Sequence, residues 1–223
     1  KVVEDMGFSG IDINMGCPSK KVVKSEHGVA LRRNLDKAFE LIETLAKATS
    51  LPVSVKTRLG WSDSSDLVMF GKGAENAGAQ MICIHGRTYV EPYNVPAQWD
   101  PVYQLKEAVS IPVLGNGGIE SYQDGINKMG CLDGFLIGQA SFGNPWIFCP
   151  NGHIPSLSEK IDLILQHAQW LVDDKGLRVG MREIRKHLVQ YIKGVNGAKA
   201  FRSQLVRVES VSEIRDILSA IDI

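Results

Sequence analysis

Short apolar runs alternate with amphipathic segments from residue 10 to residue 137. In the first run Ile11 and Ile13 alternate with Asp12 and Asn14, and similar runs recur at regular intervals. Such runs predict buried strands, and the apolar spacing between them is typical of helices. The predicted strands are 10–14, 51–58, 80–85, 111–114 and 134–137, and the predicted helices are 34–49, 65–77, 101–109 and 121–129. This alternation indicates an α/β fold with a parallel sheet.

Each predicted strand ends in, or is directly followed by, polar residues or glycines. They are Asn14 and Cys17, Lys56 and Arg58, His85 and Arg87, Asn116 with Gly117 and Gly118, and Gly138 with Gln139. Successive strands that bring functional groups to one rim are typical of a (β/α)₈ TIM barrel, whereas a doubly wound sheet concentrates its ligand contacts at one switch point. We therefore expect a TIM barrel. Because residues 1–10 look like the end of a helix before a strand, we expect roughly the first three βα units to be missing.

The pattern becomes wholly helical after a linker rich in proline and glycine at 149–158. Apolar periodicity predicts helices at 161–174, 181–193, 198–206 and 211–221, with a glycine-containing break at 194–197. We expect two domains, a partial barrel over 1–150 and a small C-terminal helical domain over 156–223.

The composition is that of a soluble globular protein, and the net charge does not indicate a binding partner. The chain has 223 residues, 44% of them hydrophobic and 22% charged, and its formal net charge is zero, as in ordinary soluble domains. No run approaches the length of a membrane span. The four cysteines show no spacing typical of zinc or disulfide frameworks, so we expect a cytoplasmic protein with no metal.

Cys17 is the first candidate for chemistry. It lies in a Gly-Cys-Pro turn close to Lys20 and Lys21, where a core side chain is unexpected and nearby cations favour a reactive thiol. A small buried hydrophobic residue is the alternative, and it is the expected fate of Cys83 inside a strand. The turns at 116–118 and 138–139 expose backbone N–H groups ahead of helices, which predicts a phosphate site.

The helical part has a basic segment. Arg178, Arg182, Arg185 and Lys186 follow one helical stripe, with Glu183 as the one acidic residue among the cations of 178–207. A solvated helix face is the common interpretation of such a run. The scarcity of acidic partners favours a nucleic-acid backbone instead. Tyr89, Tyr93 and Trp99 in the long loop could stack on RNA or pack the loop down, and we favour packing for Trp99.

Several segments together carry a family resemblance. In order they are DINMGCPSKKV, SVKTRLGW, IHGRT, VLGNGGI, IGQASFGNPWIF and REIRKHLVQYIKGVNGAKAFR. This series, from about Gly10 to about Leu218, resembles the tRNA-dihydrouridine synthase family of FMN-containing (β/α)₈ barrels with a C-terminal helical domain. The resemblance implies flavin-dependent reduction of uridine to 5,6-dihydrouridine in tRNA, with bound FMN recharged by NADPH, in a monomer.

The resemblance also implies roles for individual residues. Cys17 would protonate C5 of the uracil while hydride passes from reduced FMN to C6. Lys56, His85, Asn116, Gly117, Gly118, Gly138 and Gln139 would bind FMN, and Asn14, Arg58, Arg87, Arg178, Arg182, Arg185 and Lys186 would bind the tRNA substrate. Gln139 departs from the arginine usual in the family, which predicts weaker FMN binding. Two alternatives stay open: an inactive RNA-binding fragment, and an FMN barrel oxidoreductase that acts on a free small molecule.

Overall fold

Five parallel strands form one sheet, and their order in the sheet is their order in the chain. They are β1 (Ile11–Met15), β2 (Val53–Arg58), β3 (Met81–His85), β4 (Val113–Asn116) and β5 (Gly134–Leu136). A computed structural model describes residues 1–195 and 197–220. The sequential order contains no reversal of the kind that defines a doubly wound sheet, so it agrees with a TIM-barrel-like arrangement.

Helices lie between the strands as the periodicity predicted. They are α2 (Lys20–Lys24), α3 (Leu35–Ala48), α4 (Leu67–Asn76), α5 (Asp100–Ala108) and α6 (Tyr122–Met129), with the 3₁₀ helix η1 (Gly28–Arg33) before α3; helix α1 (Val2–Asp5) precedes β1. The four helices expected between strands are confirmed. Helix α2 and η1 were not predicted, because each is too short for an apolar repeat to show.

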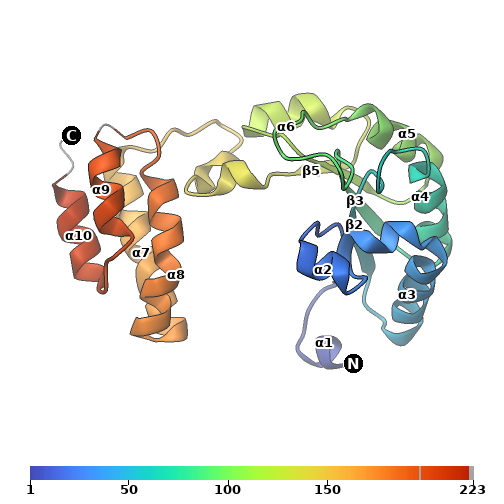
Figure 1. Cartoon of the computed structure of the whole chain (residues 1–223), viewed down its shortest axis with the longest axis horizontal. Coiled ribbons are helices and arrows are strands. Elements are labelled where there is room, and N and C mark those ends of the chain that lie inside the picture. Colours follow the sequence, from blue (N-terminus) through green and yellow to red (C-terminus); the bar gives the residue numbers. More distant parts are fainter. Residues whose placement is uncertain (196, 221–223) are drawn as a thin grey trace. The chain divides into compact units, whose positions relative to one another are not determined.

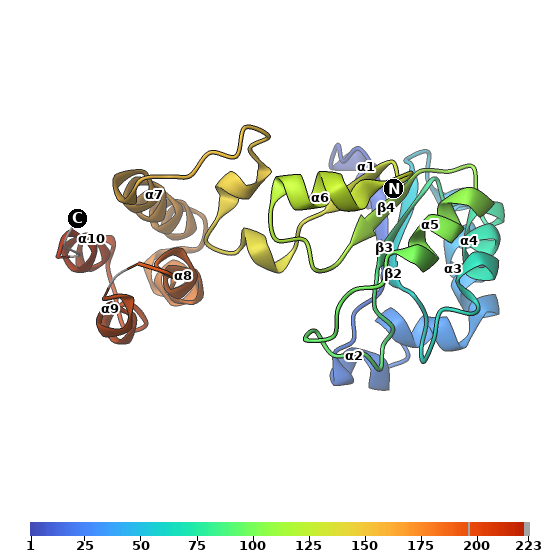
Figure 2. The ribbon, with the colours of Figure 1, turned by 90° about the horizontal axis from the view of Figure 1, so that it is seen from above.

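The two faces of the sheet differ in chemistry. Helices α3, α4 and α5 lie along one side of the strands (Figure 2). On that side Ile13, Val55 and Ile82 pack with Phe70 and other helix residues in a buried core. Because side chains alternate along a strand, the neighbouring positions in register point to the other face. Those positions hold Asp12, Asn14, Ser54, Lys56, Arg58, Cys83, His85, Leu114 and Asn116.

The chain divides into two compact units. Residues 1–120 with 124–137 form the first, and residues 121–123 with 138–223 form the second. The second contains the 3₁₀ helices η2 (Gln139–Ser141) and η3 (Pro145–Phe148). It also contains the helices α7 (Leu157–Lys175), α8 (Leu177–Tyr191), α9 (Ala198–Leu205) and α10 (Val211–Ser219), and these four are labelled in Figure 1. Its core includes Ile164, Ile184, Leu188, Leu205 and Ile214.

The first two helices of the second unit begin four residues earlier than expected. Helix α7 begins after Ser156, which forms a reciprocal capping box with Glu159. Helix α8 begins directly after Gly176, whose φ of +75° ends α7. Gly180 lets the two helices approach, since a Cβ there would lie 2.5 Å from the Leu171 carbonyl oxygen. The end of the predicted helix 211–221 and residue 196 of the predicted break lie outside the described residues.

Candidate active site

The carboxyl ends of β1 to β4 carry a connected group of polar side chains on the sheet face opposite the helices. In register, Asn14 lies beside Lys56, and Arg58 lies beside His85, which lies beside Asn116. The Lys56 Nζ donates to Asn116 Oδ1 at 3.3 Å, and Asn116 Nδ2 donates to the Leu136 carbonyl at 2.8 Å. The structure therefore joins the ends of β2, β4 and β5 through side chains that the sequence predicted separately.

Arg58 connects the turn after β1 to the loop after β3. Its side chain is buried, with Nε donating to the Gly16 carbonyl at 3.3 Å and Nη1 to the Thr88 carbonyl at 2.8 Å. A planar guanidinium can serve both acceptors because its donors point in fixed directions. Arg58 thus holds the residue before Cys17 in place.

His85 is neutral, and its contact with Arg87 assigns its tautomer. Burial, together with the positive charges of Arg58, Lys56 and Arg87, lowers its pKa to about 3. Arg87 Nη1 lies 3.0 Å from His85 Nε2. Because an arginine can only donate, Nε2 is the acceptor and the proton is on Nδ1. His85 therefore offers this rim an N–H donor without adding a charge.

The Cys17 turn is fixed from two sides. Asn14 Oδ1 accepts from the backbone N–H of Gly16 at 3.1 Å and of Cys17 at 3.0 Å, so Asn14 caps the turn. On the other side the Val29 N–H donates to the Cys17 carbonyl at 3.2 Å. A Cβ on Gly28, which has φ +60°, would lie 2.7 Å from that carbonyl oxygen. Helix η1 can therefore pack closely against a partly buried cysteine.

Cys83 is buried, as expected, but it lies on the polar face beside Lys56 rather than in the apolar core. Burial raises the pKa of its thiol to about 11, while the charge of Lys56 acts in the opposite direction. The thiol is protonated at neutral pH and is a poor nucleophile. The two strand-associated cysteines are thus in different chemical environments.

Two glycines in the turn after β4 have backbone conformations that other residues rarely adopt. Gly117 and Gly118 have φ values of +118° and +64°. A Cβ on Gly117 would lie 2.8 Å from His85 Cδ2, whereas the nearest atom to one on Gly118 is 3.9 Å away. The other predicted phosphate residues, Gly138 and Gln139, follow β5 and belong to the second unit, where Gln139 begins η2. Their role stays a prediction.

The long loop after β3 closes on itself at its base. The Gln98 N–H donates to the Gly86 carbonyl at 2.6 Å, and Glu91 accepts from the Thr88 N–H at 2.6 Å. Trp99 packs against the core, which confirms packing for this residue. Tyr89 stacks on Trp61 with ring centroids 4.1 Å apart. Tyr93, however, is exposed, with its ring 5.8 Å from that of His85.

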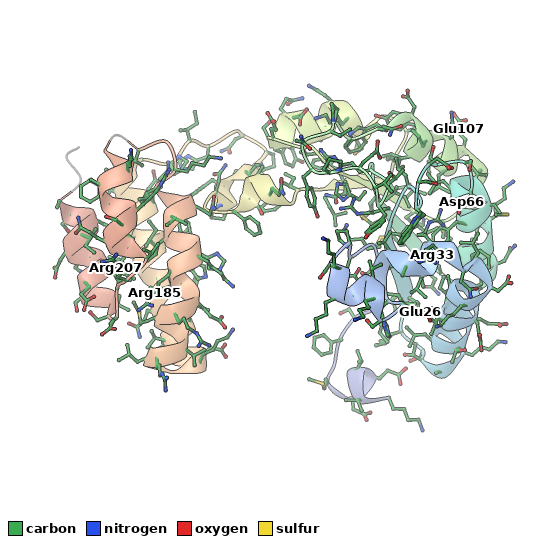
Figure 3. All side chains as sticks on the ribbon, in the orientation of Figure 1. Glu26, Arg33, Asp66, Glu107, Arg185 and Arg207 are labelled. Atoms are coloured by element: carbon green, nitrogen blue, oxygen red, sulfur yellow. The ribbon has the colours of Figure 1, made fainter. Side chains whose placement is uncertain are left out.

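Three of the four predicted basic side chains on α8 are exposed, and the fourth is held by hydrogen bonds to backbone carbonyls. Arg178, Arg182 and Lys186 are exposed. Arg185 instead donates from Nε and Nη2 to the Val208 carbonyl, at 3.0 and 2.8 Å, and reaches the Arg207 carbonyl at 3.4 Å (Figure 3). Helical spacing could not reveal this, because the acceptors lie more than twenty residues further along the chain. Glu183 pairs with Lys175 at 2.8 Å.

Within residues 1–195 and 197–220, no three or more histidine, cysteine, aspartate or glutamate side chains are grouped as metal ligands would be. Over the same residues, no helix has both the length and the apolar character needed to cross a bilayer.

Comparison with known proteins decides the family. The family model for dihydrouridine synthase (Dus) matches residues 1–222. The chain belongs to the dihydrouridine synthase family. It is 37% identical to the probable tRNA-dihydrouridine synthase of Rickettsia prowazekii, over 91% of this chain and 65% of that protein. It is 38% identical to the probable tRNA-dihydrouridine synthase 1 of Synechocystis sp., with 95% and 63% covered.

A third relative of this family is tRNA-dihydrouridine synthase B of Pseudomonas aeruginosa, 37% identical over 92% of this chain and 65% of that protein. The chain thus spans slightly less than two thirds of these three relatives. Among solved structures, a dihydrodipicolinate synthase from Agrobacterium tumefaciens is 12% identical with a TM-score of 0.48, covering 99% of this chain and 89% of that one. That likeness is too weak to bear on the fold.

Proposed function

We propose that this chain carries the reducing site of an enzyme that converts uridine to 5,6-dihydrouridine in tRNA. FMN would be the bound cofactor and NADPH its reductant, and Cys17 would be the proton donor. The five strands would be strands four to eight of a (β/α)₈ barrel. One observation carries the proposal: the turn that presents Cys17 is bonded through Arg58 to the same rim that holds Lys56, His85 and Asn116.

The residues of this rim fit FMN. Lys56, held toward Asn116 at the strand ends, supplies a cation for the pyrimidine edge of the flavin. Neutral His85 supplies an N–H donor beside it. Gly117 leaves no room for a side chain, so its turn presents bare backbone, which suits the phosphate. Gln139 would add an amide where a cation would bind more strongly.

Bound FMN in its reduced form would supply a hydride to C6 of the target uracil. Cys17 gives the proton on its Sγ to C5, so that the C5–C6 double bond becomes single, and the thiolate regains a proton from solvent. A thiol suits this step because it can act as a positioned general acid. Asn14 and the Val29 N–H hold the turn from which Sγ reaches the substrate. Arg58 fixes the turn from the substrate side, and Arg87 keeps His85 in its donor tautomer.

The RNA would bind chiefly through phosphate contacts. The exposed Arg178, Arg182 and Lys186 of α8 provide cations for the RNA phosphates. Arg185 stabilises the protein instead, because it donates hydrogen bonds to the Val208 carbonyl. The target base must leave its stack to reach a buried rim, as in other enzymes that act on bases. Such binding weakens steeply with added salt.

The test combines a spectrum with one substitution. Purified chain incubated with FMN and dialysed should keep a flavin absorption band, and with NADPH it should reduce uridine in tRNA but not free uridine. Cys17→Ala should keep the flavin and lose nearly all turnover, whereas the matched Cys131→Ala, at an exposed cysteine, should behave as wild type. Full turnover by Cys17→Ala would refute the proton donor. Reduction of free uridine would favour a small-molecule oxidoreductase, and tRNA binding without FMN uptake would favour an RNA-binding protein.

A further inference from the structure

Arg32 is a buried cation that the proposed chemistry does not use. It lies in η1, and its side chain is wholly buried, whereas its neighbour Arg33 is exposed. Its Nη2 donates to the Leu59 carbonyl at 3.1 Å and to Asp66 Oδ1 at 2.5 Å, and its Cζ lies 4.0 Å above the Phe70 ring. Burial lowers the pKa of this guanidinium to about 10, so it is charged at neutral pH.

The contacts of the buried Arg32 side chain do not stabilise the fold more than an apolar side chain would. Two of the guanidinium nitrogens, Nε and Nη1, are buried and have no hydrogen-bond partner among the described residues. Replacing a buried ion pair by apolar side chains of similar volume is often neutral or stabilising. The arginine therefore contributes a geometry that an apolar residue could not supply: one planar group that contacts a backbone carbonyl, a carboxylate and an aromatic ring together.

The contacts of Arg32 complete a closed circuit around the cysteine turn. The Val29 N–H of η1 bonds the Cys17 carbonyl, and Arg32 of the same η1 bonds the Leu59 carbonyl. Leu59 follows Arg58 in the chain, and Arg58 returns to the Gly16 carbonyl, directly before Cys17. Asp66 lies at the N-cap of α4 and anchors the circuit to the helix layer. Figure 3 labels Asp66 and the neighbouring Arg33 in this region.

We propose that Arg32, held by Asp66, is a positioning residue that fixes η1 against the Cys17 turn and so sets the accessibility of the thiol. The inference rests on the proposed function only in that Cys17 is taken to be the proton donor. Arg32 touches neither substrate nor cofactor and acts through the Val29–Cys17 hydrogen bond.

The test measures the thiol directly and needs no flavin. The full chain is treated with iodoacetamide, and the modification rates of Cys17 and of the exposed Cys131 are measured in the same molecules by mass spectrometry. In Arg32→Met the ratio of the two rates should rise about threefold or more, because local opening of the turn becomes more frequent. Hydrogen exchange should also quicken in the peptide that contains Val29. Arg32→Lys, which keeps a cation for Asp66 but lacks the planar group, should give a ratio between those of wild type and Arg32→Met.

Arg33→Met is the matched control, since it removes an exposed arginine from the same 3₁₀ helix, where its Cζ lies 4.9 Å from the Trp61 ring. It should leave the ratio unchanged. A wild-type ratio in folded Arg32→Met, or an equal rise in Arg33→Met, would overturn the proposal. If Arg32→Met does not fold, Asp66→Asn decides: a raised ratio supports the positioning role and an unchanged one refutes it. Failure to bind FMN or reduce tRNA would sink the proposed function while leaving these ratios as they are.

Discussion

A methyl group added at Gly117 should cost the first unit much more stability than one added at the next residue. At Gly117 the backbone has φ +118°, a conformation that costs an L-residue about 1–3 kcal/mol. The new Cβ would also lie 2.8 Å from Cδ2 of His85, a ring already held by Arg87 and close to Tyr93. Such overpacking typically costs about 1–3 kcal/mol more, so Gly117→Ala should destabilise by about 2–6 kcal/mol.

Gly118→Ala separates the cost of the backbone conformation from the cost of the contact with His85. Its φ of +64° is in the left-handed helical region, where alanine costs about 1–2 kcal/mol, and its Cβ would have no neighbour closer than 3.9 Å. Either substitution also lowers the conformational entropy of the unfolded chain, which stabilises the folded state by about 0.4–1 kcal/mol. This gain is the same in both variants and cancels when they are compared. After this offset, Gly118→Ala should lose about 0–1.6 kcal/mol and Gly117→Ala about 1–5.6 kcal/mol.

Urea unfolding provides the assay. Replacing Trp146 and Trp170 of the second unit by Phe leaves Trp61 and Trp99, so that tryptophan fluorescence reports the first unit. The free energies of unfolding follow from linear extrapolation. Two alanine variants within about 0.5 kcal/mol of each other would refute the reasoning, because the contact with His85 would then contribute nothing.

Three further predictions concern the second unit. Burial lowers the pKa of both His167 and His187, so folding favours the neutral form of each side chain. The stability that the two neutral histidines contribute is complete above about 6.5, the pKa of histidine in the unfolded chain, and is lost as the pH falls below it. The urea midpoint should therefore drop between about pH 7.5 and pH 5.5, and it should drop less in His167→Gln. An equal drop in His167→Gln would show that His167 does not cause the pH dependence. Arg185→Met should lower the stability of the unit by about 1–2 kcal/mol, because the Val208 carbonyl loses its charged donors. Arg182→Met should change stability by less than about 0.5 kcal/mol while weakening tRNA binding and reducing its salt slope by about one, and an unchanged slope would remove Arg182 from the interface.

The alternation of short apolar runs with amphipathic segments was sufficient to predict the parallel strands and the helices between them. It was sufficient because burial of one face imposes a period of two on a strand and of 3.6 on a helix, and both periods are local. The polar residues at strand ends were also readable, since parallel strands end at a common rim. The same local information could not reveal α2 or η1, which are shorter than the repeat that would mark them.

Contacts between distant segments were decided by the tertiary structure alone. Arg58 and Gly16 are 42 residues apart, and Arg32 and Asp66 are 34 apart, so no spacing along the chain announces either pair. Sheet register placed Cys83 on the polar face beside Lys56, although its neighbours in sequence suggested the apolar core. The tautomer of His85 likewise depends on where Arg87 points its guanidinium. Sequence alone thus determined which strand ends carry chemical groups, and packing determined which of those groups contact one another, because hydrogen bonds depend on positions in space rather than on residue order.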